Sequence, residues 1–453
     1  MKILLVRPKP HKETIGLKHV MICEPLELEY LISNIPDDIK SEIKAEIVDM
    51  ILERESFEDI LARIKPDFIV FTGYITHVGT IKEMAKTAKT IVPSVKTGVG
   101  GVHAEVVPRD FISDYIDFIY DKNGIDNFNI SLRGLLNNKS PEEIKAEINK
   151  GLKKSTFDYR YPARNAVKKY RKKYYYMFHN PCALIKTSFG CPYNCSFCFC
   201  KEITGGAYFT RDIKDVIEEL SSIQEEEVYI VDDDFLYDRD RLKSFIRELK
   251  ANKINKKFLV YGRADFIAHN RDIINEFKSM GLQAVIVGIE SVRAGDLKDY
   301  RKGTSVEINE ECIKILKEAG IELYATLIIP QDFKKEDFKE LVTWLRRLNV
   351  RFVNLQPLTP LPGTEIFDEY ESSLLVDRQK FQMWDMAHLV LKPEHMSVRA
   401  FYGEILKAYY RVVMRPKHMV YLVRKYGFGA NLKMLAGSSL ISLQYLKKIV
   451  RSY

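Results

Sequence analysis

The first third of the chain alternates apolar runs with amphipathic stretches. Five apolar runs have the length and composition of strands, namely KILLV, AEIVDM, DFIVFTG, SVKTGVGG and YIDFIYD. The stretches near residues 25–35, 56–64, 79–90 and 125–137 have helical spacing. Such alternation predicts a parallel sheet with helices on both faces. An open sheet of this kind binds ligands beyond the carboxyl ends of its strands.

A second series of strand–helix units follows from about residue 183. Its strands are CALIKTS, EVYIVDDD, KFLVYGRAD, QAVIVGIES, ELYATLIIP and RFVNLQPL. Six such units predict a partial or full (β/α) barrel, whose chemistry belongs at the carboxyl ends of the strands. The basic, aromatic segment between the two series predicts a linker that packs between domains, and the end of the chain has a helical pattern. We therefore expect an α/β domain at 1–145, a linker at 146–180, a barrel at 181–370 and a helical basic region at 371–453.

Length and composition fit this division. A chain of 453 residues is too long for one average core, so two or three domains are expected. The start MKILLVRP runs directly into a predicted strand, so no signal peptide is expected, and no apolar run has the length of a membrane span. Seven clustered cysteines do not resemble a secreted disulfide framework. These features predict a soluble, cytoplasmic protein.

The charge of the last part of the chain has one sign. No acidic residue follows Glu404, whereas ten basic residues do: Lys407, Arg411, Arg415, Lys417, Arg424, Lys425, Lys433, Lys447, Lys448 and Arg451. A basic tail interleaved with apolar residues fits peripheral contact with an anionic membrane, or nucleic acid. The alternative, which we favour, is a basic helical cap on the core. Nucleic acid is not expected as a partner, because phosphate contact alone would be nonspecific.

Four of the seven cysteines lie in the stretch TSFGCPYNCSFCFC. Cys191, Cys195 and Cys198 have the spacing C-x3-C-x2-C, in the loop after the first barrel strand. Three thiolates from a short loop suit a [4Fe–4S] cluster with one open iron. Structural zinc would require a closed set of four ligands, which Cys200 is poorly spaced to complete. We therefore favour iron–sulfur over zinc and over an unliganded set. The remaining cysteines are expected to be small buried hydrophobes: Cys23, Cys182, Cys200 and Cys312.

The segment CPYNCSFC resembles the motif C-x3-C-x-aromatic-C of the radical S-adenosylmethionine (SAM) superfamily, with Phe197 at the aromatic position. The resemblance implies that the open iron of a [4Fe–4S] cluster chelates S-adenosyl-L-methionine. It also implies that the reduced cluster cleaves SAM to a 5′-deoxyadenosyl radical, which abstracts hydrogen from a substrate. An external low-potential electron donor would then be a partner.

Later strand ends extend this resemblance. Asp232, Asp233 and Asp234 end the second strand, where the family places groups near the SAM amine. Glu290 and Ser291 end the fourth strand and resemble the segment that binds the SAM ribose. The candidates for the SAM carboxylate or the substrate are Arg263, Asp265, Arg301 and Lys302. For each of these residues the alternative is a solvated charge at a strand end.

An α/β domain ahead of such a barrel resembles the cobalamin-binding class of the superfamily. The phrases EPLELEYL, GVGGVHAEVVP, YPAR and LTPLPGTEIFDEY carry this likeness, which implies a flavodoxin-like (Rossmann-type) cobalamin-binding domain. The D-x-H-x-x-G motif is absent, and neither His11 nor His77 is favoured as a cobalt ligand. The expected corrin contacts are therefore loop residues: Thr72, Gly73, Tyr74, Gly100, Gly101 and His103. The alternative is a domain without cofactor, whose glycines only form tight turns.

The resemblance implies a cobalamin-dependent radical SAM enzyme, and methyl transfer to an unactivated carbon is the activity expected. The second hypothesis is oxidative cyclisation or ring rearrangement with the same cofactors. A radical SAM enzyme that has lost cobalamin and a non-catalytic iron–sulfur module rank lower. No residue is assigned a catalytic acid–base role. The substrate is left open among small molecules, lipids, tetrapyrroles and peptides.

Overall fold

A five-stranded parallel sheet forms the first lobe of the molecule. The computed structural model describes residues 1–151 and 157–450. The sheet order is β3-β1-β4-β5-β6, and the strands are β1 (Lys2–Arg7), β3 (Lys44–Asp49), β4 (Phe68–Thr72), β5 (Lys96–Gly100) and β6 (Phe118–Ile119). With these strands renumbered in chain order, the sequence is 2-1-3-4-5, the flavodoxin-like arrangement. The expected fold of this lobe is confirmed.

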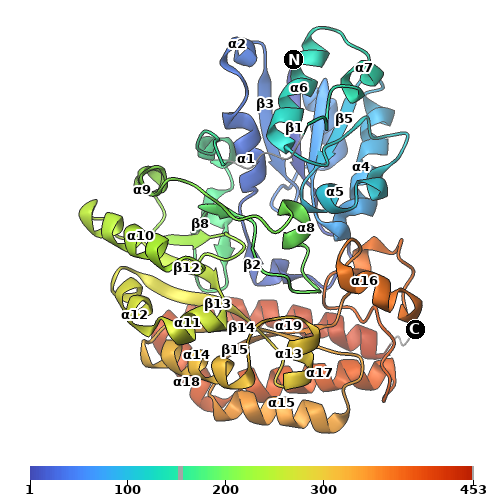
Figure 1. Cartoon of the computed structure of the whole chain (residues 1–453). Helices are drawn as coiled ribbons and strands as arrows, with labels where there is room; N and C mark the ends of the chain where they lie inside the picture. The colour runs from blue at the N-terminus through green and yellow to red at the C-terminus, as the bar shows by residue number, and fades with distance from the viewer. Residues whose placement is uncertain (152–156, 451–453) are drawn as a thin grey trace.

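Helices cover both faces of this sheet (Figure 1). They are α1 (Leu26–Ser33), α2 (Asp37–Lys40), α3 (Phe57–Ile64), α4 (Val78–Ile91), α5 (Val102–Val106), α6 (Gly124–Leu136) and α7 (Pro141–Lys145). Three-residue and four-residue 3-10 turns also occur here: η1 (Leu17–His19), η2 (Ile75–His77) and η3 (Pro108–Phe111). One core lies around Phe68 and Phe128, and a second around Phe57 and Phe71 on the other face. The four predicted helices correspond to α1, α3, α4 and α6.

The predicted strand YIDFIYD is wrong in length, because only two of its residues pair as β6. Asp117 turns its carboxylate back to accept the backbone N–H of Thr97 at 2.8 Å and the Nζ of Lys89 at 2.8 Å. These side-chain bonds replace ladder bonds at the start of the strand. The edge of the sheet is therefore short.

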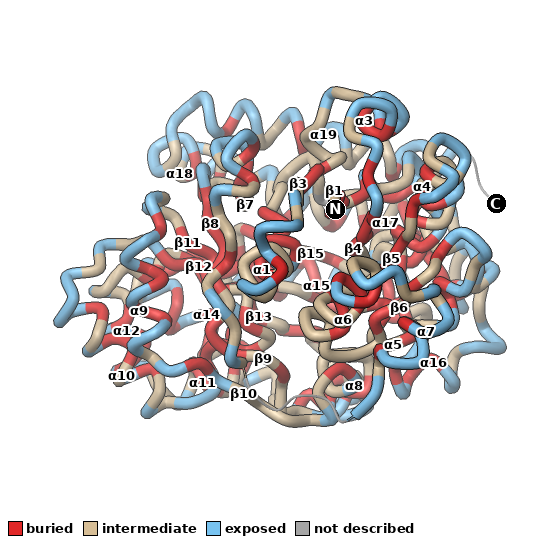
Figure 2. Tube along the Cα trace, turned by 90° about the horizontal axis from the view of Figure 1, so that it is seen from above, coloured by how far each residue is buried: buried red, intermediate tan, exposed pale blue. Residues whose placement is uncertain are grey.

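The second lobe contains six parallel strands in the order β8-β11-β12-β13-β14-β15. They are β8 (Cys182–Ile185), β11 (Glu227–Ile230), β12 (Lys257–Gly262), β13 (Leu282–Glu290), β14 (Glu322–Ile329) and β15 (Phe352–Pro357). The edge strands β8 and β15 do not pair with each other, so the predicted partial barrel is confirmed. Its helices are α9 (Ile213–Ser222), α10 (Arg239–Ala251), α11 (Ala264–His269), α12 (Arg271–Ser279), α13 (Ala294–Asp299), α14 (Val306–Glu318) and α15 (Lys335–Arg347). The buried positions trace the strands of both lobes (Figure 2).

Short elements occupy the region between the lobes. Two antiparallel pairs, β2 (Met21–Ile22) with β7 (Tyr175–Tyr176) and β9 (Ser188–Phe189) with β10 (Phe209–Thr210), were not predicted. Helix α8 (Cys200–Thr204) lies between the lobes, and α16 (Glu365–Tyr370) lies beside the first lobe (Figure 1). Two 3-10 turns, η4 (Arg164–Val167) and η5 (Arg171–Lys173), belong to the segment predicted as a linker. Its residues 152–156 lie outside the described part of the chain.

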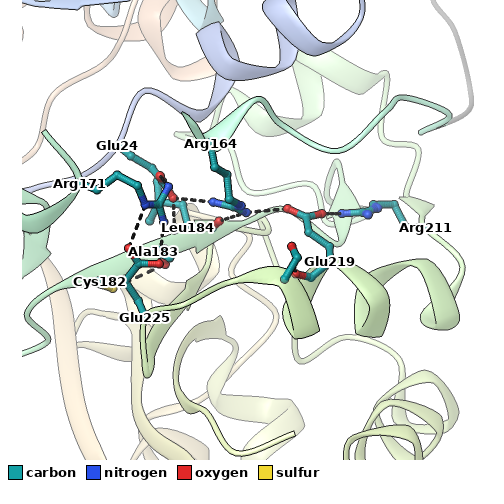
Figure 3. Close-up of polar contacts among 10 residues, drawn as sticks. Glu24, Arg164, Arg171, Cys182, Ala183, Leu184, Arg211, Glu219 and Glu225 are labelled. Atoms are coloured by element: carbon teal, nitrogen blue, oxygen red, sulfur yellow. Dashed lines mark hydrogen bonds and ion pairs between the residues drawn. The ribbon is translucent and has the colours of Figure 1, made fainter. Parts of the chain in front are cut away.

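A network of buried charges ties this segment to both lobes (Figure 3). Arg164 pairs with Glu24, which precedes α1, at 3.0 Å and with Glu219 of α9 at 2.6 Å. Arg211 binds the other oxygen of Glu219 at 2.6 Å. Arg171 joins Glu24 to Glu225 in the same way, at 3.0 and 2.7 Å. Because these carboxylates are buried or nearly so, the segment holds the two lobes in one orientation.

The end of the chain is less helical than expected between residues 374 and 397, which form turns and the 3-10 turn η7 (Phe381–Met383), after η6 (Glu371–Ser373). Regular helix begins at α17 (Val398–Val413) and continues with α18 (Pro416–Tyr426) and α19 (Phe428–Val450). Tyr409 Oη of α17 accepts the backbone N–H of Leu355 at 2.8 Å, which anchors the helix on β15. Among the helices described, none is both long and apolar enough to cross a bilayer. The predicted domain bounds stay a prediction.

Candidate functional site

The cysteine loop begins where β9 ends, beyond the carboxyl end of β8. Gly190 has a φ of +89°, and a Cβ there would lie 2.1 Å from the carbonyl oxygen of Ala207. The loop can therefore start only with glycine. Further along, the Ser196 N–H donates to the Tyr300 carbonyl, and the Ile366 N–H donates to the Ser196 carbonyl, both at 3.2 Å. These bonds hold the loop between α13 and α16.

Phe197 packs edge-on against Tyr300, with ring centroids 5.6 Å apart. The Nζ of Lys302 lies 6.0 Å from the centroid of the same ring. Phe197 thus anchors the loop between two ligand candidates, Cys195 and Cys198. An aromatic residue at this position has a packing role that needs no cofactor.

The thiols of Cys191, Cys195 and Cys198 share one electrostatic neighbourhood. Burial, together with the charges of Asp234, Cys198 and Cys195, raises the pKa of Cys191 to about 12. Burial also raises the pKa of Cys195, against the lowering influence of Lys302 and Arg263. Two buried cations beside Cys195 favour a thiolate there, which is the form that binds iron.

No group of three or more His, Cys, Asp or Glu side chains within residues 1–151 and 157–450 is arranged to hold a single metal ion. A [4Fe–4S] cluster holds its thiolates farther apart than one ion would. The three cysteines therefore stay a predicted ligand set.

Cys200 is not the buried hydrophobe that was expected. Its thiol lies 3.8 Å from Asp233 Oδ1, and its hydrogen bond to Cys198 is the largest influence that lowers the pKa of Cys198. Cys182 and Cys312 are buried as predicted, and Cys23 is partly exposed. Cys200, at the start of α8, thus lowers the pKa of Cys198 through a hydrogen bond.

The three aspartates after β11 point in different directions. Asp232 is fully buried and accepts the N–H of Thr187 at 2.6 Å and the Oγ of Ser188 at 2.7 Å. Asp233 accepts the N–H of Gly190 at 2.8 Å. Asp232 therefore secures the chain after β8, and Asp233 secures the start of the cysteine loop.

Asp234 differs from its neighbours, because neither carboxylate oxygen has a hydrogen-bond partner among the described residues, although both are buried. Burial raises the pKa of Asp234 to about 7, against the lowering influence of Arg263 and Lys302. A buried carboxylate without a donor is costly unless a ligand supplies one. Asp234 thus fits a cationic amine, such as that of SAM.

Arg263 and Lys302 lie on the barrel side of Cys195. The guanidinium of Arg263 stacks over Tyr193 at 3.7 Å from the ring centroid and binds Asp265 Oδ1 at 3.0 Å. One of its nitrogens lies 4.0 Å from Cys195 Sγ. Lys302 Nζ binds Glu290 Oε1 at 2.8 Å in the barrel interior. Both cations are already paired, so they reach a ligand only by sharing or exchanging these bonds.

Two other candidates are already bonded to protein groups. Ser291 Oγ donates to Asp296 Oδ2 at 2.6 Å and accepts the N–H of Arg293, so it forms the turn into α13. Arg301 pairs with Glu365 of α16 at 2.5 Å. Both residues therefore have protein partners, and no bond among the described residues joins either of them to Asp234.

The loops at the carboxyl edge of the first sheet are close to each other. Thr72 Oγ1 donates to Glu27 Oε1 at 3.1 Å. Gly101 has a φ of +99°, and a Cβ there would lie 3.1 Å from Thr72 Oγ1 and 3.2 Å from the Gly73 carbonyl. A Cβ at Gly100 would meet nothing nearer than 3.6 Å. Glycines at this edge leave backbone open to a ligand, which fits a corrin contact made by loops.

His103 has a protein partner instead of a free ring. Its Nε2 lies 2.9 Å from Asp110 Oδ2, and Arg378 binds the same carboxylate at 2.8 and 3.0 Å. The three side chains connect α5 to the turns that follow α16. Sequence reasoning could not find Arg378, because a pairing across 268 positions leaves no local signal.

His77 is poorly placed to bind cobalt. Its Nδ1 accepts the backbone N–H of Tyr74 at 3.2 Å, and its Nε2 is buried without a partner in the described part of the chain. Burial and Arg7 lower its pKa to about 4, so the ring is neutral. His11 Nδ1 accepts the N–H of Glu13 at 3.3 Å in an exposed turn. The earlier preference against both histidines fits these positions.

Tyr74, beside the first sheet, and Tyr261, on β12, are both partly exposed side chains. Desolvation raises the pKa of Tyr74, followed by the charges of Glu27, Cys23 and Tyr261. The influence of Tyr261 indicates that the two tyrosines, one on each lobe, lie near each other. Tyr261 was missed, although it lies two positions before Arg263 on β12 and so shares its face.

Helix α5 of the first lobe has two contacts with later segments of the chain. Helix α5 contacts α8. A Cβ at Gly363, whose φ is +89°, would lie 2.4 Å from Val106 Cγ1. The segment LPGTEIF therefore packs its glycine directly on α5. The cysteine loop and the carboxyl edge of the first sheet thus border the same part of the molecule.

Comparisons with known proteins agree with this geometry. The model of the radical SAM superfamily matches residues 185–345, and the model of the B12 binding domain matches residues 15–128. The hopanoid C-3 methylase of Methylococcus capsulatus is 29% identical over 92% of this chain and 81% of its own length. An anaerobic magnesium-protoporphyrin IX monomethyl ester cyclase of Cereibacter sphaeroides is 22% identical over 83% of this chain and 64% of its own.

Among solved structures, the radical S-adenosylmethionine methyltransferase TsrM of Kitasatospora setae, with cobalamin and a [4Fe–4S] cluster bound, superposes with a TM-score of 0.68. The superposition covers 92% of this chain and 89% of that one, at 14% identity. At this identity the likeness shows the shared fold of both lobes.

Proposed function

Because residues 185–345 match the radical SAM superfamily and residues 15–128 match the B12 binding domain, we propose that the chain is a cobalamin-dependent radical SAM methyltransferase acting on an unactivated carbon. The observation that carries the proposal is the contact between α5, which follows the loop of Gly100 and Gly101, and α8, which follows the cysteine loop. This contact supports a substrate site at the junction of the two lobes.

Different residues of the barrel mouth would bind the iron–sulfur cluster and SAM. Cys191, Cys195 and Cys198 would hold three irons of a [4Fe–4S] cluster. The unpartnered carboxylate of Asp234 would accept the ammonium group of SAM, while Arg263 and Lys302 stabilise negative charge beside Cys195. When bound, the cluster and SAM supply radical chemistry and cobalamin supplies methyl transfer, which are reactions that protein side chains cannot perform.

The first lobe would contact the corrin through its loops. Thr72, Gly73, Tyr74, Gly100 and Gly101 are the proposed contacts, and His103 supports them through Asp110. The exposed ring of Tyr74 offers a flat apolar face for the corrin. Gly363 packs directly on Val106 of α5, the helix that follows Gly100 and Gly101.

The proposed partners are a small-molecule substrate and an external low-potential electron donor. The named relatives act on a hopanoid and on a magnesium protoporphyrin ester, both large and mainly apolar molecules. We infer a substrate of similar character, with a lipid or tetrapyrrole preferred to a peptide. Ring formation with the same cofactors is the second hypothesis, because the cyclase relative matches most of this chain.

The test is anaerobic reconstitution with iron, sulfide and hydroxocobalamin, followed by SAM carrying a labelled methyl group and a low-potential reductant. We expect 5′-deoxyadenosine and label on the bound corrin, and then label on a supplied hopanoid or tetrapyrrole. Product that gains a ring without label would favour cyclisation. SAM cleavage without bound corrin would contradict the cobalamin-dependent proposal.

A further inference from the structure

The outer face of α19 presents large apolar side chains to solvent. Their exposed fractions run from 42% to 72%, and they are Phe428, Leu432, Leu443, Leu446 and Val450. At 3.6 residues per turn these positions fall on one side of the helix. On the opposite side Tyr445 is buried against Tyr402, with ring centroids 6.0 Å apart. The helix therefore has two apolar sides, of which the protein covers one.

Helix α18, which contacts α19, also exposes apolar side chains. Val420 and Val423 are 52% and 39% exposed, and they lie on one face of the helix with Lys417 and Arg424. We call the exposed side chains of α18 and α19 the outer face. Several large apolar side chains exposed on the face of one helix indicate an interaction site. Figure 2 shows both helices at the periphery of the molecule.

The charged side chains of α18 and α19 themselves all have one sign. Lys417, Arg424 and Lys447 are exposed and form no ion pair within residues 1–151 and 157–450. Acidic neighbours come from other segments: Glu322 binds Lys425, and Glu13 has its pKa lowered by a hydrogen bond from Gln382 and by the charges of His11 and Lys448. Arg451 lies outside the described residues. A helix that carries an exposed apolar stripe and only cations of its own has the pattern of one that lies in the headgroup region of an anionic membrane.

We propose that the outer face of α18 and α19 docks on an anionic lipid bilayer. Nucleic acid would leave the leucines and valines without partners. A second copy of this chain, packed on the same face by a twofold axis, would bring the cations of both copies together. A bilayer accommodates both the apolar stripe and the cations.

The position of α19 would bring a docked bilayer close to the junction of the two lobes. A Cβ at Gly437 would lie 2.2 Å from the carbonyl oxygen of His19, so α19 packs directly on η1 of the first lobe. Gln444 Nε2 also donates to the Thr14 carbonyl at 3.2 Å. Helix α19 thus bridges the second lobe and the loop after β1, so a bilayer docked on its outer face would lie beside the junction of the lobes.

The experiment is sedimentation of the full chain with vesicles of phosphatidylcholine mixed with phosphatidylglycerol, and with phosphatidylcholine alone. One variant combines Leu432→Ser, Leu443→Ser and Leu446→Ser; a second combines Lys417→Glu, Arg424→Glu and Lys447→Glu. The matched controls are Ile112→Ser, at an exposed apolar position of the first lobe, and Lys250→Glu on α10. All the changed residues are exposed, and circular dichroism checks that each variant folds.

We expect the unchanged chain and both controls to sediment with the mixed vesicles, and each triple variant to partition at least about tenfold less. Sedimentation that the triple variants retain would overturn the proposal, as would a chain that stays in solution. Light scattering tests the alternative that a second copy of the chain binds this face. A dimer that the serine variant dissociates, in a chain that does not bind vesicles, would assign the face to self-association. SAM cleavage is measured on the same variants. Variants that lose vesicle binding but still cleave SAM separate the docking proposal from the proposed reaction.

Discussion

Lys302 Nζ and Glu290 Oε1 lie 2.8 Å apart in the space that a side chain at position 288 would occupy. A Cβ on Gly288 would come within 2.1 Å of Glu290 Oε1 and 2.6 Å of Lys302 Nζ. Glu290 also has a φ of +61°, in the left-handed region that non-glycine residues seldom adopt. The glycine of GIES and the lysine of RKG thus serve one buried ion pair beside the cysteine loop.

Removing one partner of this pair should leave a buried, uncompensated charge. We expect Lys302→Met to lower the free energy of unfolding by about 3–5 kcal/mol, because Lys302 is the one ion-pair partner of Glu290 within residues 1–151 and 157–450. The double variant Lys302→Met with Glu290→Gln should recover most of that loss. Urea titration followed by circular dichroism measures both. Equal stability of the single variant and the unchanged chain would show that the pair is solvated.

The charge network of the linker gives a second stability prediction. Arg164→Met should cost about 1–3 kcal/mol, because Glu24 and Glu219 each lose one of two cations and keep Arg171 and Arg211. Its matched control is Arg133→Met, which removes an exposed pair with Asp38 and should leave the unfolding midpoint unchanged. Similar losses in both variants would contradict a specific role for the interlobe network. The measurement is again the urea midpoint.

These two clusters show what the sequence could and could not predict. Both parallel sheets and the cysteine loop follow from short-range patterns, namely the alternation of strand and helix and the spacing of three thiols. The partners of Glu24, Asp110 and Glu290 could not be predicted, because each pairing depends on how distant segments pack.

The aspartates after β11 show the same limit at closer range. Asp232, Asp233 and Asp234 are adjacent and chemically identical, so the sequence assigned them one role. In the structure the three side chains leave the turn after β11 in different directions. Asp234 alone among them has no partner within the described residues. Ser291, assigned to the site through the resemblance of GIES, has a partner that the sequence did not reveal, because its hydroxyl donates to Asp296 in the turn into α13.

Asp234 should make stability depend on pH. Its folded-state pKa of about 7 lies above the ordinary value of 3.8, so the folded state holds the proton more tightly than the unfolded state does. Stability should therefore fall as the pH rises from about 4 to about 7, by roughly 1–4 kcal/mol at most. Asp234→Asn, which stays neutral, should remove this slope and be more stable than the unchanged chain at neutral pH. An unchanged slope would show that the carboxylate is solvated.

The same residue gives an opposite expectation for ligand binding. A SAM ammonium group needs the ionised carboxylate, so SAM affinity should increase as the pH rises through about 7. Asp234→Asn should bind SAM at least about tenfold more weakly and without this pH dependence. Equilibrium dialysis of the reconstituted protein with SAM, without reductant, measures both. Equal affinities would remove Asp234 from the SAM site.

The ligand set of the cluster can be tested through iron content. Cys195→Ala should reduce bound iron and sulfide after reconstitution and abolish SAM cleavage, because a cluster held by two thiolates is not retained. Cys312→Ala is the control, since Cys312 is buried in the barrel core, and it should keep both. Binding of hydroxocobalamin should be the same in the two variants. The cluster assignment would be falsified if Cys195→Ala kept normal iron content.

The corrin contacts are tested by two neighbouring residues with opposite expectations. His77 Nδ1 already accepts the Tyr74 N–H, so we expect the histidine to act through the η2 turn and not as a cobalt ligand. His77→Ala should therefore change hydroxocobalamin affinity no more than about threefold, through loosening of that turn. The ring of Tyr74 is exposed at the carboxyl edge of the first sheet, and Tyr74→Ala should weaken binding at least about fivefold by removing apolar contact area. Visible spectra of the bound corrin give a second readout, because loss of a histidine ligand would shift the cobalt absorption. A spectrum that changes in His77→Ala, with affinity retained in Tyr74→Ala, would reverse the assignment and make the histidine the cobalt contact.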